Sequence, residues 1–411
     1  MTEPLVIVGG GLATAGAARA IREAGHDGDV VVIGSEPHHP YERPPLSKDY
    51  LRRETDRTAL FTLEQGWYAE HRVDVRTATT AVGLDVTDHR LTLADGRQQR
   101  YSRLLLATGS SPRAAGIPGE DLLGVLSLRT VESSDLLHAT LVAAAQAGGR
   151  LVVVGDGWIG VEVAASARTL GLDVTVLGHG RQPLGKVLGE RMGAFYADAH
   201  LEHGVTLRRQ VAVASIDGLA GRVTGVTLAD GSTLPADVVL VAVGAAPNTG
   251  LAVSAGIELR ARELGGGIAV DATLATGAPD VFAAGDVASI PSPVYGRAVR
   301  VEHWDTALKT GPHAGAAMLG ENAVYDRLPY FYSDQYDIGM EYTGFVAGPA
   351  DYDEVVISGS LAAREFVAFW TSGGLVRAGM AVNSWDRMPA VDALIRSGAV
   401  VSRAELTAFH G

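Results

Sequence analysis

The chain has 411 residues, of which 47% are hydrophobic and 20% are charged, and its formal net charge is −13. This length and composition predict a compact protein of two or three domains, and the excess of acidic residues argues against nucleic acid as a partner. The absence of cysteine excludes electron transfer through a protein thiol, iron–sulfur ligation and cysteine-based zinc sites.

Metal and membrane association are also not expected. The 12 histidines have no spacing typical of metal ligands, so we expect no metal site. No apolar run approaches the roughly 20 residues that span a bilayer, and the N-terminus lacks the basic region of a signal peptide. We therefore expect a cytoplasmic protein without membrane association, and we expect a monomer.

The first predicted unit is a strand–turn–helix–strand segment over residues 5–34. Apolar residues lead into the turn Gly9–Gly11, an alanine-rich helix follows, and Val30–Ile33 is the second strand. In such a turn glycine permits the sharp bend and lets backbone N–H groups approach a pyrophosphate at the positive end of the helix. Thr14 stands where a third glycine is usual. Glu36 follows the second strand, where a carboxylate binds an adenosine ribose; a solvated loop carboxylate is the alternative.

The same plan recurs later in the chain. After a polar segment from Glu54 to Glu70, expected as a surface excursion, Asp95-Gly96 is predicted to be a hairpin turn. A second strand–turn–helix–strand unit spans residues 151–177 and contains the glycine turn Gly155–Gly160. Two downstream segments also repeat: Asp230-Gly231 matches Asp95-Gly96, and Val241–Gly244 matches Leu106–Gly109. One GxGxxG is weak evidence in a chain with 51 glycines, but two copies followed by matching downstream segments indicate two nucleotide-binding units.

The C-terminal part has a different pattern. A strand ends near Ala284, Gly285-Asp286 follow, and a helix is expected around Trp304–Leu319. From Pro329 onward, β-rich segments such as Phe366–Trp370 predict a third, smaller domain that ends in a helix around Val391–Arg396. The second nucleotide-binding unit is therefore inserted into the first.

Seven motifs now carry a resemblance. In chain order they are GGGLA at 9–13, RPPLSK at 43–48, ATG at 107–109, GDGWIGVE at 155–162, VFAAGD at 281–286, VEHW at 301–304 and SDQY at 333–336. Together they resemble the FAD-dependent ferredoxin reductases that serve bacterial dioxygenases and monooxygenases, over essentially the whole chain. The RPPLSK motif is the most specific, because it lies where thiol-dependent relatives place their redox cysteines.

The resemblance implies an α/β fold with two Rossmann-like domains, arranged as in glutathione reductase, and a smaller α+β C-terminal domain. It implies an FAD-binding domain over 1–112 and 246–320, an NAD(P)H-binding domain over 113–245, and the C-terminal domain over 321–411.

It also implies where FAD binds. The diphosphate lies on the first turn, the ribose on Glu36, the adenine at the backbone of Val82, and the ribityl chain on Asp286. The helix after His303 directs its positive end toward the flavin, where reduction places negative charge. The full set implied for FAD is Gly9, Gly11, Leu12, Ala13, Glu36, Arg43, Lys48, Val82, Ala107, Thr108, Gly109, Arg129, Asp286, Glu302, His303 and Trp304.

The implied coenzyme site follows the second turn, and it departs from the family at one position. Gly178 stands where a glutamate usually binds the ribose of NADH and repels the phosphate of NADPH. His179, Arg181 and Lys186 supply positive or potentially positive groups nearby, so we expect NADPH to be used at least comparably to NADH. The alternative is a flexible loop that accepts either coenzyme. The residues implied for this site are Gly155, Gly157, Trp158, Ile159, Gly160, Glu162, Gly178, His179, Arg181, Lys186 and Gly244.

Lys48 and Glu162 are the catalytic candidates. The resemblance places them facing each other beside flavin N5, the atom that accepts hydride; an ordinary structural ion pair is the alternative. Trp158 is expected either to cover the flavin face or to pack at a domain interface. Two further departures are Tyr332, which replaces a tryptophan near the flavin edge, and Thr306, which replaces an asparagine.

The implied activity is electron transfer from NAD(P)H through FAD to a [2Fe-2S] or similar ferredoxin that feeds an oxygenase. Basic residues near Tyr332 are candidates for docking this acidic partner: Arg52, Arg53, Arg300 and Lys309. Two alternatives stay open, a membrane-associated NADH:quinone reductase and a non-catalytic flavin-binding sensor.

Overall fold

The computed structural model describes residues 3–64 and 66–409, and the chain divides into two compact units. The first comprises Met1–Glu42, Arg57–Ser111 and Ala246–Tyr330, and the second comprises Arg43–Asp56, Pro112–Ala245 and Phe331–Gly411. The short strands β8 (Ser110–Pro112) and β17 (Ala245–Pro247) lie where the chain passes from one unit to the other. Within the described part of the chain, no helix has the length and apolarity to cross a bilayer.

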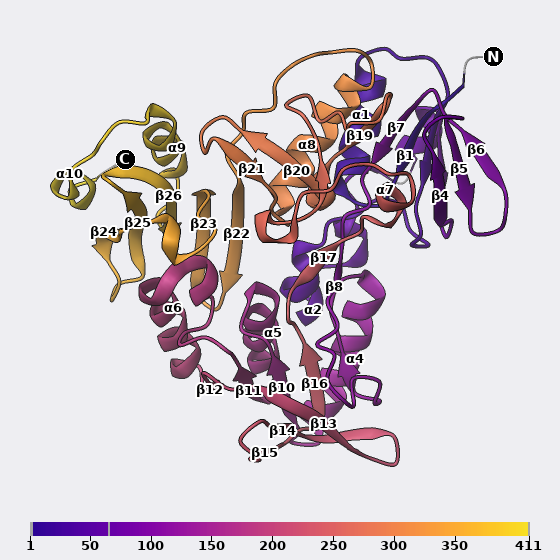
Figure 1. Ribbon diagram of the computed structural model, residues 1–411. Coiled ribbons are helices and arrows are strands. Elements are labelled where there is room, and N and C mark those ends of the chain that lie inside the picture. Colours follow the sequence, from indigo (N-terminus) through magenta and orange to yellow (C-terminus); the bar gives the residue numbers. More distant parts are fainter. Residues whose placement is uncertain (1–2, 65, 410–411) are drawn as a thin grey trace. The chain divides into compact units, whose positions relative to one another are not determined.

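A five-stranded parallel sheet forms the centre of the first unit. Its order is β3 (Val73–Arg76), β2 (Val30–Ile33), β1 (Leu5–Val8), β7 (Arg103–Leu106) and β19 (Val281–Ala283). Every residue of β1 and β2 is buried, as expected for a parallel sheet covered on both faces. The helix α1 (Leu12–Glu23) connects these two strands, so the predicted strand–turn–helix–strand unit is confirmed (Figure 1).

The helix α8 (Trp304–Ala317) packs against α1 at close range. A Cβ on Gly311 would lie 2.2 Å from the carbonyl oxygen of Ala13, and one on Gly315 would lie 2.7 Å from that of Ala17. The two helices approach closely because glycines face the carbonyl groups of the neighbour. This contact holds α1 in place behind the first glycine turn.

Smaller elements complete the first unit. The antiparallel strands β4 (Ala81–Asp85), β5 (Arg90–Leu93) and β6 (Gln98–Arg100) confirm the predicted hairpin, whose turn residue Gly96 has φ +85°. The remaining elements are η2 (Arg57–Leu60), α3 (Trp67–Glu70), α7 (Gly250–Ser254), η3 (Arg262–Leu264), β18 (Ile268–Ala269), η4 (Gly285–Val287), β20 (Ala288–Ser292) and β21 (Arg297–Val299).

The described residues from Glu54 to Glu70 are mostly exposed or half-buried, as expected for a surface excursion, but two of them are buried. Leu60 and Tyr68 are 1% and 2% exposed, although most of their neighbours are polar. The ring of Tyr68 packs edge-on against those of His39 and Trp67. A short polar segment therefore anchors itself through a few apolar side chains, which composition alone did not predict.

The second unit contains another five-stranded parallel sheet. Its order is β12 (Thr206–Arg208), β11 (Asp173–Leu177), β10 (Arg150–Val154), β16 (Val238–Val241) and β9 (Val125–Leu126). The helix α5 (Trp158–Thr169) connects β10 to β11, which confirms the second copy of the unit. The other elements here are η1 (Pro44–Ser47), α2 (Asp49–Arg52), α4 (Val131–Gln146), α6 (Gly185–Glu202), β13 (Val213–Leu219), β14 (Arg222–Leu228) and β15 (Thr233–Pro235).

The C-terminal segment adds a third sheet to the second unit (Figure 1). Its order is β22 (Tyr330–Gln335), β23 (Ile338–Gly344), β26 (Leu375–Val382), β25 (Glu365–Ser372) and β24 (Glu354–Ser360). The turn η5 (Pro349–Asp351) and the helices α9 (Met388–Ser397) and α10 (Arg403–Thr407) complete it. The helix α9 begins before the predicted Val391, because Pro389 occupies its first turn, where proline is favourable.

The strand β25 is buried on both faces. Trp370 donates its indole N–H to the carbonyl of Leu188 on α6 at 3.2 Å, whereas the ring of Phe369 packs edge-on against Phe409. Both faces are covered, so the strand is continuously apolar rather than alternating. The α/β fold with two parallel sheets and a smaller α+β C-terminal part is as expected.

Candidate functional site

The first glycine turn leaves open space in front of α1. Gly9 has φ +140°, and a Cβ there would lie 2.1 Å from the carbonyl oxygen of Ala107, so only glycine fits. A Cβ on Gly11 would meet nothing within 4 Å, and Gly11 provides no side-chain cap for α1. The N-terminal N–H groups of α1 are thus available to an anion such as a diphosphate. The hydroxyl of Thr14 donates to the carbonyl of Gly9 at 3.1 Å and closes the turn where a third glycine is usual.

The second glycine turn repeats this arrangement within the second unit. Gly155 has φ +114°, and a Cβ there would lie 2.3 Å from the carbonyl oxygen of Ala242. A Cβ on Gly160 would lie 2.2 Å from the carbonyl oxygen of Gly155, whereas one on Gly157 would meet nothing within 4 Å. Ala107 and Ala242 occupy equivalent places in the two repeats. In each repeat, the alanine carbonyl lies close to the first glycine of the turn. This contact explains why the segments around Ala107 and Ala242 are repeated together with the glycine turns.

Two predicted carboxylates of the first unit have hydrogen-bond partners that the sequence did not reveal. Glu36, half-buried after β2, accepts a hydrogen bond from the hydroxyl of Tyr41. Asp286 is 9% exposed and accepts one from Ser110 at 2.7 Å. The N–H of the neighbouring Gly285 donates to the hydroxyl of Thr310 at 2.9 Å. These partners orient the two carboxylates. Tyr41 lies five residues from Glu36, whereas Ser110 lies 176 residues from Asp286, a separation that no spacing rule connects.

The other predicted FAD residues of the first unit lie on its loops and helix ends. Thr108 donates its hydroxyl to the carbonyl of Asn248 at 2.7 Å, and Asn248 returns an amide hydrogen bond at 2.9 Å. Val82 is 56% exposed. The remaining positions are Leu12 and Ala13 at the start of α1, the buried Ala107, Gly109 with φ +65°, and Glu302, His303 and Trp304 at the start of α8.

Residues before α8 form a polar group in the first unit. Arg300 pairs with Glu302 at 2.9 Å and also donates to the backbone carbonyl of Asp286 at 3.0 Å. Burial lowers the pKa of His303 to about 4. Burial also raises the pKa of Glu42, and a hydrogen bond from Trp304 opposes that shift. The hydrogen bond from Arg300 fixes the carbonyl of Asp286 to the segment that leads into α8.

Lys48 and Glu162 form a buried ion pair in the second unit. The ammonium of Lys48 lies 2.7 Å from Oε2 of Glu162, and their side chains are 10% and 7% exposed. Ser47 donates to the same oxygen at 2.6 Å, and Ser333 donates to Oε1 at 2.7 Å. Both carboxylate oxygens are therefore satisfied, as a buried charge requires. The structure brings the two catalytic candidates together, although they stand in separate motifs.

A buried chain of hydrogen bonds continues from Ser333 to α6. The amide of Gln335 donates to the hydroxyl of Ser333 at 3.2 Å, and its carbonyl oxygen lies 2.9 Å from Nε2 of His200. The hydroxyl of Tyr336 lies 3.0 Å from Nδ1 of the same imidazole. Burial lowers the pKa of His200 to about 4, so the ring is neutral and accepts from Tyr336 while donating to Gln335. His200 was not predicted, because its partners are distant in sequence.

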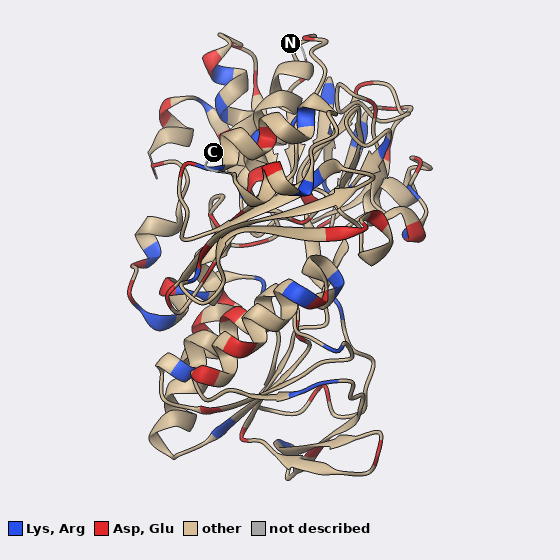
Figure 2. Ribbon diagram, turned by 90° about the vertical axis from the view of Figure 1, so that its left-hand side faces the viewer, with Lys and Arg blue, Asp and Glu red and all other residues tan. Residues whose placement is uncertain are grey.

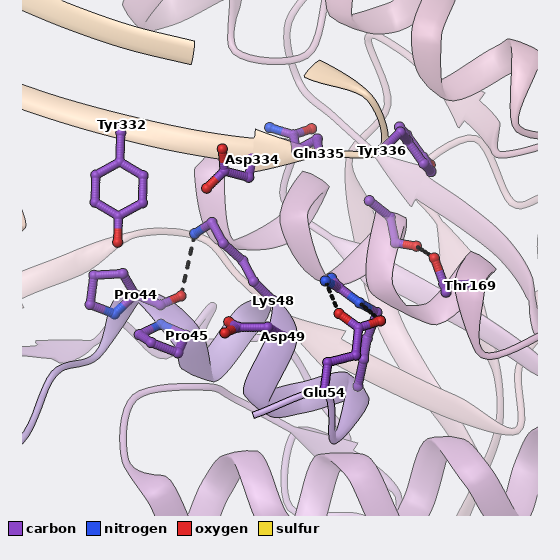
Figure 3. Close-up of a pocket in the computed structure, with 12 residues that line it drawn as sticks. Pro44, Pro45, Lys48, Asp49, Glu54, Thr169, Tyr332, Asp334, Gln335 and Tyr336 are labelled. Atoms are coloured by element: carbon purple, nitrogen blue, oxygen red, sulfur yellow. Dashed lines mark hydrogen bonds and ion pairs between the residues drawn. The ribbon is translucent and has the colours of Figure 1, made fainter. Parts of the chain in front are cut away.

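A cavity of about 420 Å³ lies beside this ion pair, wholly within the second unit. Figure 3 shows Tyr332, Asp334 and Gln335 of β22 on one side and Pro44 with Lys48 on the other. The ammonium of Lys48 donates to the carbonyl of Pro44 at 3.3 Å and lies 5.9 Å from the ring centre of Tyr332. The lining comprises Pro44, Pro45, Lys48, Asp49, Arg52, Glu54, Ala165, Thr169, Tyr332, Asp334, Gln335 and Tyr336.

Arg43 and Arg129, predicted near FAD, contact each other in the second unit. Arg43 donates a guanidinium hydrogen bond to the carbonyl of Arg129 at 2.6 Å. Trp158 packs edge-on against Tyr196 at 5.8 Å and Phe331 at 5.1 Å, so its ring belongs to an aromatic cluster with α6 and β22. All three rings lie within the second unit.

The predicted coenzyme residues surround the ends of β10 and β11. Gly178 directly follows β11, and a Cβ there would lie 2.1 Å from Oδ2 of Asp156, a residue of the second turn that the sequence did not single out. Arg181 pairs with Glu190 at 3.5 Å, and both side chains are exposed. The other positions are the exposed His179 and Lys186, Ile159 at 38% exposure, and Gly244 with φ +102°. Among residues 3–64 and 66–409, no group of three or more His, Asp or Glu side chains is arranged to hold a metal ion.

Comparison with known proteins places this geometry in a family. Residues 3–311 match the family model "Pyridine nucleotide-disulphide oxidoreductase", and residues 330–409 match "Reductase C-terminal". The chain is 36% identical to the anthranilate 1,2-dioxygenase system ferredoxin–NAD(+) reductase component of Burkholderia cepacia, over 98% of this chain and 97% of that protein. It is 35% identical to a peroxisomal monodehydroascorbate reductase of Oryza sativa subsp. japonica, over 97% of this chain and 86% of that protein.

Among solved structures, the chain is similar to putidaredoxin reductase in its covalent complex with putidaredoxin. The TM-score is 0.92 at 32% identity, over 98% of this chain and 95% of that chain. The overall fold is thus shared along almost the entire length of both chains. The chain belongs to the pyridine nucleotide-disulphide oxidoreductase family, as a member without cysteine that carries the reductase C-terminal domain.

Proposed function

We propose that this protein is an FAD-dependent NAD(P)H:ferredoxin reductase. The observation that carries the proposal is the pair of glycine turns, each ahead of a helix without a side-chain cap, in a chain that has no cysteine. Two such turns fit two dinucleotides, and without a thiol the electrons must leave through a bound redox group. The likeness to putidaredoxin reductase and to the Burkholderia component supports a ferredoxin as the acceptor.

The residues of the first unit fit FAD. The open space at Gly11 and the start of α1 suit a diphosphate, and Glu36, held by Tyr41, suits a ribose. Asp286, held by Ser110, suits the hydroxyls of a ribityl chain. We assign residues 1–112 and 246–320 to FAD, 113–245 to NAD(P)H, and 321–411 to a C-terminal domain.

The protein's own groups then have separate tasks. Bound FAD supplies the ability to accept a hydride and to release its two electrons singly. Glu162 holds the ammonium of Lys48 in a water-poor environment, and the hydroxyls of Ser47 and Ser333 fix the carboxylate that holds it. In the proposed assignment, this ammonium would favour the electron-rich, reduced state of the flavin. The N-terminus of α8 would stabilise negative charge on the reduced flavin.

The acceptor is proposed to dock near Tyr332. The overall charge of −13 requires a local basic surface for an acidic partner, and Figure 2 shows acidic and basic positions mixed along the chain. Arg52 pairs with Glu54 at 2.6 Å and Arg53 with Asp135 at 2.7 Å, which reduces their free charge. We therefore expect only a modest electrostatic contribution from them. The wider proposal is a cytoplasmic monomer whose ferredoxin feeds an oxygenase.

A spectral titration tests the function. The purified protein should be yellow, should lose its flavin absorbance when NADH or NADPH is added without oxygen, and should recover it stoichiometrically with a [2Fe-2S] ferredoxin. Faster turnover with a quinone or with an organic radical acceptor than with ferredoxin would contradict the proposed acceptor. Flavin that stays oxidised under excess of either coenzyme would instead indicate a sensor.

A further inference from the structure

The second glycine turn places an acidic group where the chain otherwise lacks one. Gly178 ends the second strand of the proposed coenzyme site, the position from which an acidic side chain normally reaches the adenosine ribose. The carboxylate of Asp156 lies directly over this glycine: a Cβ on Gly178 would be 2.1 Å from its Oδ2 and 2.6 Å from its Cγ. Asp156 therefore fills the space that a longer residue at 178 would enter.

The backbone around Asp156 holds this carboxylate in position. The N–H of Gly155 donates to the carbonyl of Leu177 at 2.9 Å, which joins the turn to the end of β11. The N–H of Leu184 donates to the carbonyl of Asp156 at 2.9 Å, which joins the turn to the segment before α6. The backbone of Asp156 is thus tied to β11 on one side and to the segment before α6 on the other, and α5 begins two residues later.

We propose that Asp156 is the residue that selects NADH over NADPH, and that it takes the place of the glutamate missing at position 178. Its carboxylate accepts hydrogen bonds from the ribose hydroxyls of NADH and repels the 2′-phosphate of NADPH. This inference rests on the proposed function, because it concerns the coenzyme of the same reaction. It predicts the opposite of the expectation drawn from Gly178, His179, Arg181 and Lys186, namely that NADPH is used at least comparably.

The nearby basic groups oppose this selection only weakly. Arg181 already pairs with Glu190, and the side chains of this pair are 70% and 69% exposed. Lys186 and His179 are exposed as well. Exposed charges are screened by water and salt, whereas the carboxylate of Asp156 is partly buried beside the strand ends. The group nearest to the ribose position is therefore acidic.

The test compares coenzymes in the FAD-loaded protein and in three variants. We expect the wild type to have a kcat/KM at least about tenfold higher for NADH than for NADPH, which is the size of one charge-assisted contact. Asp156→Ala should lower this ratio about tenfold or more. Asp156→Asn should keep much of the NADH activity, because an amide still binds hydroxyls, and should gain activity with NADPH. Asp173→Asn, which changes an exposed carboxylate on β11, is the matched control and should keep the wild-type ratio.

A double variant separates a role of Asp156 in coenzyme selection from a general disruption of the structure. Gly178→Glu alone should be impaired, because its Cβ meets the Asp156 carboxylate at 2.1 Å. Asp156→Gly combined with Gly178→Glu should recover the preference for NADH, because the acidic group returns from the other position. A merely structural role for Asp156 would not produce this exchange.

Binding measurements make the inference independent of turnover. The dissociation constants of NAD⁺ and NADP⁺ should show the same ratio and the same change in each Asp156 variant. Selection by Asp156 is overturned if the wild type binds NADP⁺ as well as NAD⁺, or if Asp156→Ala leaves the ratio unchanged. A protein that binds NAD⁺ selectively but whose flavin is not reduced by NADH would contradict the proposed function and leave the role of Asp156 intact.

Discussion

Replacing Lys48 by methionine should separate the charge of the buried pair from its packing. Methionine keeps an unbranched apolar stem of similar size but removes the ammonium that lies 2.7 Å from Glu162. The hydroxyls of Ser47 and Ser333 still donate to the carboxylate, at 2.6 Å and 2.7 Å. The variant therefore leaves a hydrogen-bonded carboxylate that has lost its counter-charge.

Two magnitudes follow from this geometry. Breaking a buried ion pair on one side costs about 3–5 kcal/mol of unfolding free energy. We expect a value near the lower limit, because two hydroxyls still bind Glu162. The loss of one charge-assisted interaction near the flavin, about 1.5–3 kcal/mol, corresponds to a reduction by NADH that is roughly ten to a hundred times slower. FAD content should stay at the wild-type level, because the proposed binding residues of the first unit are unchanged.

Three measurements check these values. Stopped-flow absorbance without oxygen gives the rate of flavin reduction by NADH, the visible spectrum gives the FAD content, and a urea titration gives the unfolding midpoint. The control is Arg52→Met, which removes another cation from α2, the short helix that begins directly after Lys48. Arg52 pairs with the half-exposed Glu54. This control variant should leave the rate of reduction unchanged.

The double variant Lys48→Met with Glu162→Gln identifies the cause of each effect. It should recover most of the lost stability, because no uncompensated charge remains buried. Its reduction should stay slow, because the positive charge is still missing. A Lys48→Met protein that is reduced at the wild-type rate would refute the argument and leave the pair as a structural feature.

Three further predictions concern other parts of the chain. Reduction of ferredoxin should slow moderately as salt increases while reduction of a small uncharged acceptor does not, and equal salt dependence would exclude a charged docking surface near Tyr332. Gly9→Ala should abolish FAD binding, because its Cβ would lie 2.1 Å from a carbonyl oxygen, whereas Gly10→Ala, whose nearest neighbour is 3.9 Å away, should retain FAD. The pKa of His200 is lowered by burial to about 4, below its ordinary value of about 6.5, so the unfolded chain binds the proton first as pH falls. This histidine should therefore lower the free energy of unfolding by about 2 kcal/mol between pH 7 and pH 5. The urea midpoint of His200→Gln should fall less steeply over this pH range than that of the wild type, and an equally steep fall would contradict the prediction.

Much of the fold and of the two dinucleotide sites could be predicted from the sequence, because their signals are local. The turns at Gly9–Gly11 and Gly155–Gly160 lie between an apolar strand and a helix, and each first glycine has a positive φ that disfavours other residues. The apolar runs Leu5–Val8 and Arg150–Val154 became central strands of parallel sheets. Such features depend on neighbouring residues, so they can be read in chain order.

The resemblance to a known family extended this reading to Lys48 and Glu162, but not to the groups that hold them. Ser47 and Ser333 lie 115 and 171 residues from Glu162 in sequence, and Ser110 lies 176 residues from Asp286. Neither periodicity nor spacing identifies such pairs. They arise only when sheets and helices pack and bring distant loops together.

At the proposed coenzyme site, a single position shows the same difference between what the sequence predicts and what the packed structure adds. The sequence by itself determined that residue 178 has no side chain, and together with His179, Arg181 and Lys186 this indicated a site that accepts NADPH. Only the tertiary structure decided that the carboxylate of Asp156 lies over this glycine. The physical reason is that the ends of β10 and β11 are adjacent in the sheet, so the turn after one strand supplies a group to the space beyond the other.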